Sequence, residues 1–269
     1  MAIKVALLGV GRMGKSVAKK VLGDSELELV AAVCASDAPE VGQDMGVLAG
    51  VGECGVKVAA LDALESVLDG AAPDVAVDFT VAEAFLDNLD TLVSRKINLV
   101  VGTTGLDDER PAIDEKIEDA GVGAVISSNM STGVNYFFKT VGDTAGLLGP
   151  GYEVVVVETH HVHKKDAPSG TARRIARILA EATGRGVREL GVIKSEDEAQ
   201  PTSGVINVYS VRRGEVVGEH KVVFTSAEDR IEFFHHSNSR DIFSAGVVKA
   251  VKYVNGKKGV YSMKEVLGI

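Results

Sequence analysis

Three histidines and two lysines fall within six positions near the middle of the chain: His160, His161, His163, Lys164 and Lys165. Half of the six histidines of the whole chain are therefore found in this one segment. Imidazole groups exchange protons most readily near neutral pH, and lysines carry positive charge that can attract an acidic ligand. The segment is a candidate site for proton transfer to a small anionic molecule.

The start of a helix follows this segment. Ser169-Gly170-Thr171 opens a strongly amphipathic stretch directly after a turn at residues 166–168. Unpaired backbone N–H groups and the positive end of the helix dipole gather at a helix start, so the amides of Gly170 and Thr171 can hold an anion. In the alternative interpretation, Ser169 is only an N-cap and the lysines are solvated.

A metal site built from His160, His161 and His163 is less favoured. Imidazole is a good zinc ligand, but adjacent residues on an extended chain point in opposite directions. The neighbouring lysines would also repel a cation. We therefore predict no metal site.

A glycine-rich turn lies between a short apolar strand at residues 3–8 and a helix at residues 15–22. Its sequence, GVGRMG, is the G-x-G-x-x-G dinucleotide fingerprint in the strand–turn–helix context that the fingerprint requires. The first glycine permits the tight turn, the second lets the backbone approach a pyrophosphate, and the third allows close helix–strand packing. The cofactor contacts predicted here are Gly9, Val10, Gly11, Arg12, Met13 and Gly14.

The end of the second predicted strand, residues 27–33, bears on the choice of nucleotide. An NAD-selective site places an acid near this point, whereas this chain has Cys34-Ala35-Ser36 and reaches its first acid at Asp37. Arg12 can pair with a 2′-phosphate. We expect a preference for NADPH with NADH accepted, and Ser36 at the ribose. Alternatively, Arg12 is a surface charge and Asp37 still reaches the ribose.

Strands and helices continue to alternate, with strands at residues 75–79, 98–101 and 123–126 and helices at residues 82–93 and 107–119. This alternation predicts a parallel sheet, in which ligands bind beyond the carboxyl ends of the strands. The turns at these ends are Phe79-Thr80, Gly102-Thr103-Thr104 and Ser127-Ser128-Asn129. We expect them to line a nucleotide crevice.

The pattern changes in the C-terminal half. Strands are predicted at residues 204–211, 215–225 and 230–236, and their short links predict antiparallel neighbours. We expect an open sheet with helices on one face, and an opposite face apolar enough for self-association. The acidic stretch 189–203 is expected to be a mobile loop. A helix at residues 243–253 is expected to return to the first domain.

The overall composition excludes several classes of protein. The 269 residues, 45% hydrophobic and 25% charged, suit a soluble globular chain of one large or two smaller domains. The net charge of −9 argues against nonspecific binding to nucleic acid or anionic membranes. Cys34 and Cys54 lack zinc-site spacing and favour a reducing compartment. With no signal peptide and no apolar run of membrane-spanning length, a cytoplasmic location is expected.

Taken together, the motifs resemble those of the 4-hydroxy-tetrahydrodipicolinate (dihydrodipicolinate) reductases of lysine and diaminopimelate synthesis. The resemblance covers nearly the whole chain, and the histidine–lysine–SGT signature is its most specific part. The matching motifs are GRMG (11–14), VDFT (77–80), VGTTG (101–105), SSNMSTGVN (127–135), ETHHVHKKDAPSGTA (158–172), RRGEVVGEH (212–220) and SNSRDIFSAG (237–246).

The resemblance implies an α/β enzyme with two domains. An N-terminal Rossmann dinucleotide-binding domain (1–129, with 241–269 returning to it) would bind NADPH or NADH. An α+β domain with an open mixed sheet (130–240) would bind a small dicarboxylate and join four copies into a homotetramer. The reaction implied is reduction of 4-hydroxy-tetrahydrodipicolinate, with loss of water, to tetrahydrodipicolinate.

The resemblance also implies roles for individual residues. His160 would donate a proton, and Lys164 would assist it and bind substrate. The remaining substrate contacts would be His161, Ser169, Gly170, Thr171 and Arg240, and the nicotinamide contacts would be Gly102, Thr103, Thr104, Ser127, Ser128, Asn129 and Met130.

Two departures from the family pattern concern the nucleotide. The glycine motif is one residue shorter than the G-x-x-G-R-M-G of many members, and Cys34 replaces an acidic residue. Two other functions stay open. Another two-domain NAD(P)-dependent amino-acid dehydrogenase leaves the grouping of His160, His161 and Lys164 unexplained, and a non-catalytic nucleotide-sensing protein would bind nucleotide without turnover.

Overall fold

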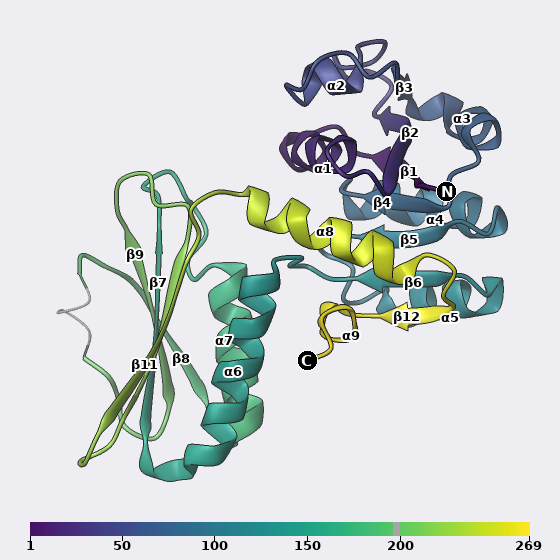
Figure 1. Ribbon diagram of the computed structural model, residues 1–269. Helices are drawn as coiled ribbons and strands as arrows, with labels where there is room; N and C mark the ends of the chain where they lie inside the picture. The colour runs from purple at the N-terminus through teal and green to yellow at the C-terminus, as the bar shows by residue number, and fades with distance from the viewer. Residues whose placement is uncertain (196–199) are drawn as a thin grey trace. The chain divides into compact units, whose positions relative to one another are not determined.

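The structure is a computed structural model that describes residues 1–195 and 200–269 (Figure 1). The chain divides into two compact units, Met1–Thr132 with Asp241–Ile269, and Gly133–Arg240. Because the C-terminal segment belongs to the first unit, the second unit is an insertion within the first. Each unit is built around its own sheet.

The sheet of the first unit has seven strands in the order β12-β6-β5-β4-β1-β2-β3, and every neighbouring pair is parallel. Its central strands β4, β5 and β6 are buried throughout and apolar except for Asp78 and Asn98, as expected for a sheet covered on both faces. The strands are β1 (Ile3–Leu8), β2 (Leu27–Cys34), β3 (Val58–Ala60), β4 (Val75–Asp78), β5 (Asn98–Val101), β6 (Gly123–Ile126) and β12 (Gly259–Tyr261).

Helices cover both faces of this sheet. The valines and alanines of α1 and α8 pack on one face, and the leucines and isoleucines of α3, α4 and α5 pack on the other. This is the predicted Rossmann arrangement. The helices of the unit are α1 (Arg12–Leu22), α2 (Met45–Leu48), η1 (Leu61–Ala63), α3 (Leu64–Ala71), α4 (Ala82–Ser94), α5 (Arg110–Ala120), α8 (Asp241–Val254) and α9 (Met263–Leu267).

The second unit has a mixed five-stranded sheet in the order β11-β10-β7-β9-β8. Two helices, α6 (Thr132–Leu148) and α7 (Gly170–Thr183), lie side by side on one face of it and share one apolar core with β7, β9 and β10 (Figure 1). The remaining elements are η2 (Gly149–Gly151), β7 (Glu153–His160), β8 (Val187–Ile193), β9 (Ile206–Arg212), β10 (Glu219–Thr225) and β11 (Arg230–His236).

The predicted pairing of the first two C-terminal strands is wrong. β10 and β11 are antiparallel neighbours as expected, but β7 lies between β9 and β10 and pairs with both. The link from β9 to β10 crosses the end of β7 and bonds to it there, through Arg213 N to His160 O and Val162 N to Gly214 O. A short link can therefore connect two strands, here β9 and β10, that have a third strand between them in the sheet.

Three local predictions also need correction. Residues 189–193 of the expected loop 189–203 belong to strand β8, which is parallel to β9. Residues 196–199 of that loop lie outside the described residues. Helix α1 begins at Arg12, inside the glycine motif, and not at residue 15 as predicted. Helix α5 begins only at Arg110, because Pro111 lacks the N–H that a helix started at residue 107 would need there.

Within residues 1–195 and 200–269, no helix combines the length and the apolar character needed to cross a membrane.

Candidate active site

The glycine turn of the first unit has the geometry that a pyrophosphate site needs. Gly9 has a φ of +92°, and a side-chain carbon there would stand 2.6 Å from Phe79 O. A carbon on Gly14 would stand 1.9 Å from Gly9 O, so this glycine permits the helix to pack on the turn. A carbon on Gly11 would meet no atom within 4 Å. Open space before the start of α1 fits a bound phosphate.

The other predicted nucleotide contacts lie along the same edge of the sheet. The turns after β4, β5 and β6 follow neighbouring strands, and the ring of Phe79 packs against Gly102, where a side-chain carbon would stand 2.2 Å from Cε1. Ser128 and Thr104 are exposed, whereas the side chain of Met130 belongs to the apolar core. Any contact from Met130 to a nucleotide therefore comes from its backbone.

A buried carboxyl group joins two of these turns. Asp78, 1% exposed, accepts hydrogen bonds at Oδ1 from Thr103 Oγ1 (2.6 Å), Thr80 Oγ1 (2.8 Å) and Thr80 N (3.0 Å). Burial raises the pKa of Asp78 against the opposing effect of these bonds. The Asp78 carboxylate thus connects the turn after β4 to the turn after β5. This role of Asp78 was not predicted from the sequence.

The end of β2 carries the polar groups expected near a ribose. Ser36 Oγ donates to Asp62 (2.7 Å), and Lys15 in α1 pairs with Glu40 at 3.0 Å. Arg12 is exposed at the first position of α1. Its position is compatible with contact to a 2′-phosphate.

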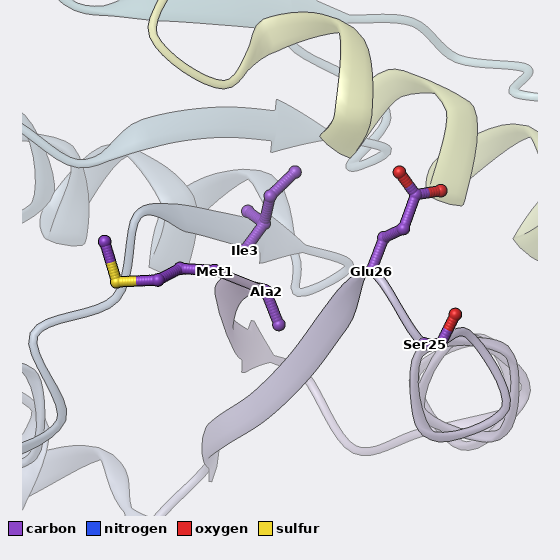
Figure 2. A pocket seen from close by; sticks show the side chains of 5 residues that line it. All are labelled: Met1, Ala2, Ile3, Ser25 and Glu26. Carbon is purple, nitrogen blue, oxygen red and sulfur yellow. The ribbon is translucent and has the colours of Figure 1, made fainter.

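A pocket elsewhere in the first unit is unrelated to these residues. Figure 2 shows that it is lined by Met1, Ala2, Ile3, Ser25 and Glu26. These residues precede β1 and β2 or begin β1, so the pocket lies at the amino ends of the strands. Ligands of such sheets bind at the carboxyl ends, and none of the predicted contacts lines this pocket.

In the second unit, β7 ends at His160. Glu158 and His160 are two residues apart on one strand, so their side chains point to the same face of the sheet. The Glu158 carboxylate, fully buried, is hydrogen-bonded to His160 Nδ1. Glu158 also accepts from Arg212 Nη2 (3.0 Å) and Ser169 N (3.3 Å). Burial alone would raise the pKa of Glu158, but the bonds from His160, Ser210 and Arg212 outweigh it and lower the pKa to about 2.

Helix α7 begins where the sequence predicts. Ser169 is its N-cap and accepts from Ala172 N at 3.2 Å, while its hydroxyl also lies 3.3 Å from His220 Nε2. Gly170 is exposed at the helix start, and a side-chain carbon on it would meet no atom within 4 Å. The first turn therefore has open space in front of it for an anion.

Two histidines lie in the loop between β7 and α7, and the rings of His161 and His163 are 6.1 Å apart. His163 is mainly solvent-exposed near Glu215, 3.4 Å away. Burial, with the positive charge of Arg240 second, lowers the pKa of His161. Lys164 pairs with Asp166 at 2.9 Å. The loop thus carries one mainly exposed imidazole, His163, and a lysine that is already paired with a carboxylate.

His220, from β10, completes the buried group. Its ring lies 5.4 Å from that of His160 in an edge-to-face arrangement. Burial, reinforced by the nearby His160, lowers the pKa of His220 to about 3, so this ring is uncharged at neutral pH. Among the described residues, no group of three histidine, cysteine, aspartate or glutamate side chains is placed to hold a metal ion.

Comparison with known proteins gives the family of the chain. The models of the dihydrodipicolinate reductase family match residues 3–130 (N-terminus) and 133–267 (C-terminus). The 4-hydroxy-tetrahydrodipicolinate reductase of Methanothermobacter thermautotrophicus is 42% identical over 272 residues, which is 99% of each chain. That of Methanopyrus kandleri is 43% identical over 98% of this chain and 96% of its own.

The chain belongs to the dihydrodipicolinate reductase family. It is an NAD(P)H-dependent oxidoreductase, as its sequence predicts. Among solved structures, the dipicolinate-bound dihydrodipicolinate reductase from Paenisporosarcina sp. TG-14 has the same fold. Its TM-score is 0.79 at 24% identity, and the alignment covers 98% of this chain and 99% of that one.

Three residues of this candidate site were not predicted from the sequence: Glu158, Arg212 and His220. Glu158 had a local signal, because it stands two positions before His160 in a predicted strand. Arg212 and His220 lie in the matching motif 212–220, but the motif did not place them beside His160, because they reach the site only through the pairing of β9 and β10 with β7.

Proposed function

We propose that His160 is the general acid of the reductase, that Lys164 assists it, and that the start of α7 holds the substrate. Family membership makes the reaction the NAD(P)H-dependent reduction of 4-hydroxy-tetrahydrodipicolinate, with loss of water, to tetrahydrodipicolinate. This reaction belongs to lysine and diaminopimelate biosynthesis. One reduced nucleotide and one proton are consumed, and one water is released.

The orientation of His160 supports its role as acid. Its Nδ1 bonds to Glu158, so Nε2 is the nitrogen left for a substrate. Hydride arrival at the conjugated imine builds an electron-rich enamine, which must take a proton. A positioned general acid contributes roughly 10²–10⁴-fold to such a step.

The charges of the substrate match the groups around the helix start. The dianion carries two carboxylates, and Gly170 and Thr171 lie at the positive end of the 14-residue helix α7. Lys164, His161 and Arg240 add cationic or hydrogen-bonding side chains. The Lys164–Asp166 pair must then loosen or rearrange when a carboxylate binds.

The first unit holds the nucleotide in this proposal. Bound NAD(P)H supplies the hydride. The open space at Gly11 and the start of α1 receive the pyrophosphate, and the turns after β4, β5 and β6 contact the nicotinamide part. Asp78 holds the Thr80 and Thr103 turns in place.

The observation that carries the assignment is the buried Glu158–His160 pair beside the Ser169 cap. We expect His160→Gln to lower turnover by roughly 10²–10⁴-fold with little change in NAD(P)H binding. His163→Gln is the matched control, since His163 is only three residues further along the chain but is 74% exposed. The assay follows NAD(P)H oxidation with freshly made dehydratase product. Equal activity of the two variants would exclude the assignment.

We also propose that the helix-free face of the second sheet joins four copies of the chain in the cytoplasm. Val157, Tyr209 and Val211 pack together on this face, and Phe234, 60% exposed, shares it because strand pairing aligns it with Val157. Light scattering of the wild type and of Phe234→Glu tests this: a wild-type mass other than four chains contradicts it.

A further inference from the structure

The Glu158 carboxylate contacts three separate parts of the candidate substrate site. Oε2 is bonded to the imidazole of His160, and Oε1 accepts from Arg212 Nη2 and from the backbone N–H of Ser169. These partners come from the end of β7, from β9 and from the start of α7. Both carboxylate oxygens are therefore engaged, in a side chain with no solvent exposure.

Arg212 extends this network to the loop that carries Lys164. Its Nη2 donates to Asp166 O at 2.7 Å, and its Nε donates to Lys164 O at 3.3 Å. The guanidinium side chain is 11% exposed. It supplies the positive charge that a buried carboxylate requires, and it holds the loop backbone next to the sheet.

We propose that Glu158 is a positioning residue for His160, which it holds with a hydrogen on Nδ1 so that Nε2 faces the substrate. The proposal rests on the proposed role of His160 as proton donor. When Nε2 gives its proton to the substrate, the remaining hydrogen stays on Nδ1, bonded to the carboxylate. The same carboxylate stabilises the imidazolium before the transfer, since opposite charges in a buried site interact strongly.

Among the described groups around His160, only Glu158 is suited to hold the hydrogen on Nδ1. His220 on β10 is uncharged at neutral pH, and Arg212 on β9 is held by the carboxylate and by loop carbonyls. The ionisable groups that interact with His160 or with its partners include Glu158, His220, His161, Lys164, Arg212 and His235. Glu158 is the anion among them.

Glu158→Gln is the decisive variant because its amide has a defined orientation. Arg212 and Ser169 N–H both donate toward Oε1, so the amide oxygen takes that place and the amide NH₂ group faces His160. A facing NH₂ group requires Nδ1 to be an acceptor, which moves the imidazole hydrogen to Nε2. The nitrogen shifts of ¹⁵N-histidine-labelled protein report this change of tautomer and need no turnover.

Kinetics provide the second readout. We expect Glu158→Gln to lower kcat by about 10²-fold, within the roughly 10²–10⁴-fold contribution of a general acid, with the KM for NAD(P)H unchanged. In Glu158→Gln, the fall of kcat/KM at high pH should begin at a lower pH than in the wild type, because the imidazolium has lost its counter-charge. Glu158→Asp keeps the charge and should restore the position of this fall, with partial recovery of kcat.

Glu219 provides a matched control. It also pairs with a histidine and an arginine, accepting from His236 Nδ1 at 3.0 Å and from Arg213 Nη2 at 3.2 Å, but its histidine is 43% exposed. Glu219→Gln should keep wild-type kcat, pH profile and His160 tautomer. Circular dichroism and light scattering check the fold and mass of each variant.

The outcomes separate the two proposals. An unchanged His160 tautomer with unchanged kcat in folded Glu158→Gln would overturn the positioning role. If that variant does not fold, Glu158→Asp decides, because it withdraws the carboxylate from the ring and must lower kcat at least about tenfold. A wild-type protein without reductase activity would instead contradict the proposed function, while the tautomer shifts still test the inference.

Discussion

Gly218 lies directly against the imidazole of His160: a side-chain carbon at position 218 would stand 3.1 Å from Nε2. This nitrogen is the one left uncovered after Nδ1 bonds to Glu158. The missing side chain at Gly218 therefore keeps open the space that a substrate needs beside the proposed acid. Gly218 belongs to the link that carries the chain from β9 to β10 across the end of β7.

Gly218→Ala should lower kcat/KM by roughly 10- to 10²-fold, because small displacements of a reacting group from its working geometry are costly. Gly186→Ala is the control, since a methyl there meets no atom within 4 Å. Steady-state kinetics and thermal unfolding of both variants check the prediction. A Gly218→Ala enzyme with wild-type kcat/KM would show that the substrate approaches His160 from another side.

Gly14 and Gly11 should respond differently to alanine. The methyl of Gly14→Ala would stand 1.9 Å from Gly9 O, so we expect a loss of about 1–3 kcal/mol in the free energy of unfolding and weaker nucleotide binding. The methyl of Gly11→Ala enters open space, so stability should hold while NADPH affinity falls. Denaturant unfolding and fluorescence titration measure the two effects. Unaltered affinity in Gly11→Ala would place the pyrophosphate elsewhere.

His220 should make the protein less stable in mild acid. Its pKa in the folded protein is lowered to about 3, while an unfolded histidine titrates near 6.5. Between these values the unfolded chain binds more protons, so stability is present at neutral pH and falls as the pH drops through this window.

Urea unfolding at pH 7, 6 and 5 measures this loss. His220→Gln should lose less stability across that range than the wild type does. Some dependence should persist, because the pKa values of His161 and His235 are lowered as well. An equal pH dependence in the two proteins would show that His220 is not kept neutral by its burial.

Arg12 should influence the choice of nucleotide. If its guanidinium pairs with the 2′-phosphate, Arg12→Ala should raise the KM for NADPH by about tenfold, the effect of one lost charge-assisted bond, and leave that for NADH nearly unchanged. Steady-state comparison of the two nucleotides measures the ratio. Equal changes in the KM values for NADPH and NADH would show that Arg12 does not contact the 2′-phosphate.

Much of the fold follows from local patterns. The strands 98–101, 123–126 and 230–236 lie where they were predicted, because each is a short run of strand-forming residues bounded by turns. The order of strands in the second sheet was not predicted correctly. The insertion of β7 between β9 and β10 depends on pairing between distant segments, which a short link does not reveal.

The sequence by itself determined the family, the Rossmann unit and the ionisable segment around His160, because the residues of each motif are close together along the chain. Only the tertiary structure decided what surrounds that histidine. Glu158 and Arg212 are 54 residues apart in the chain, yet they form one buried ion pair. A contact of this kind depends on strand register and burial, and no local spacing encodes it.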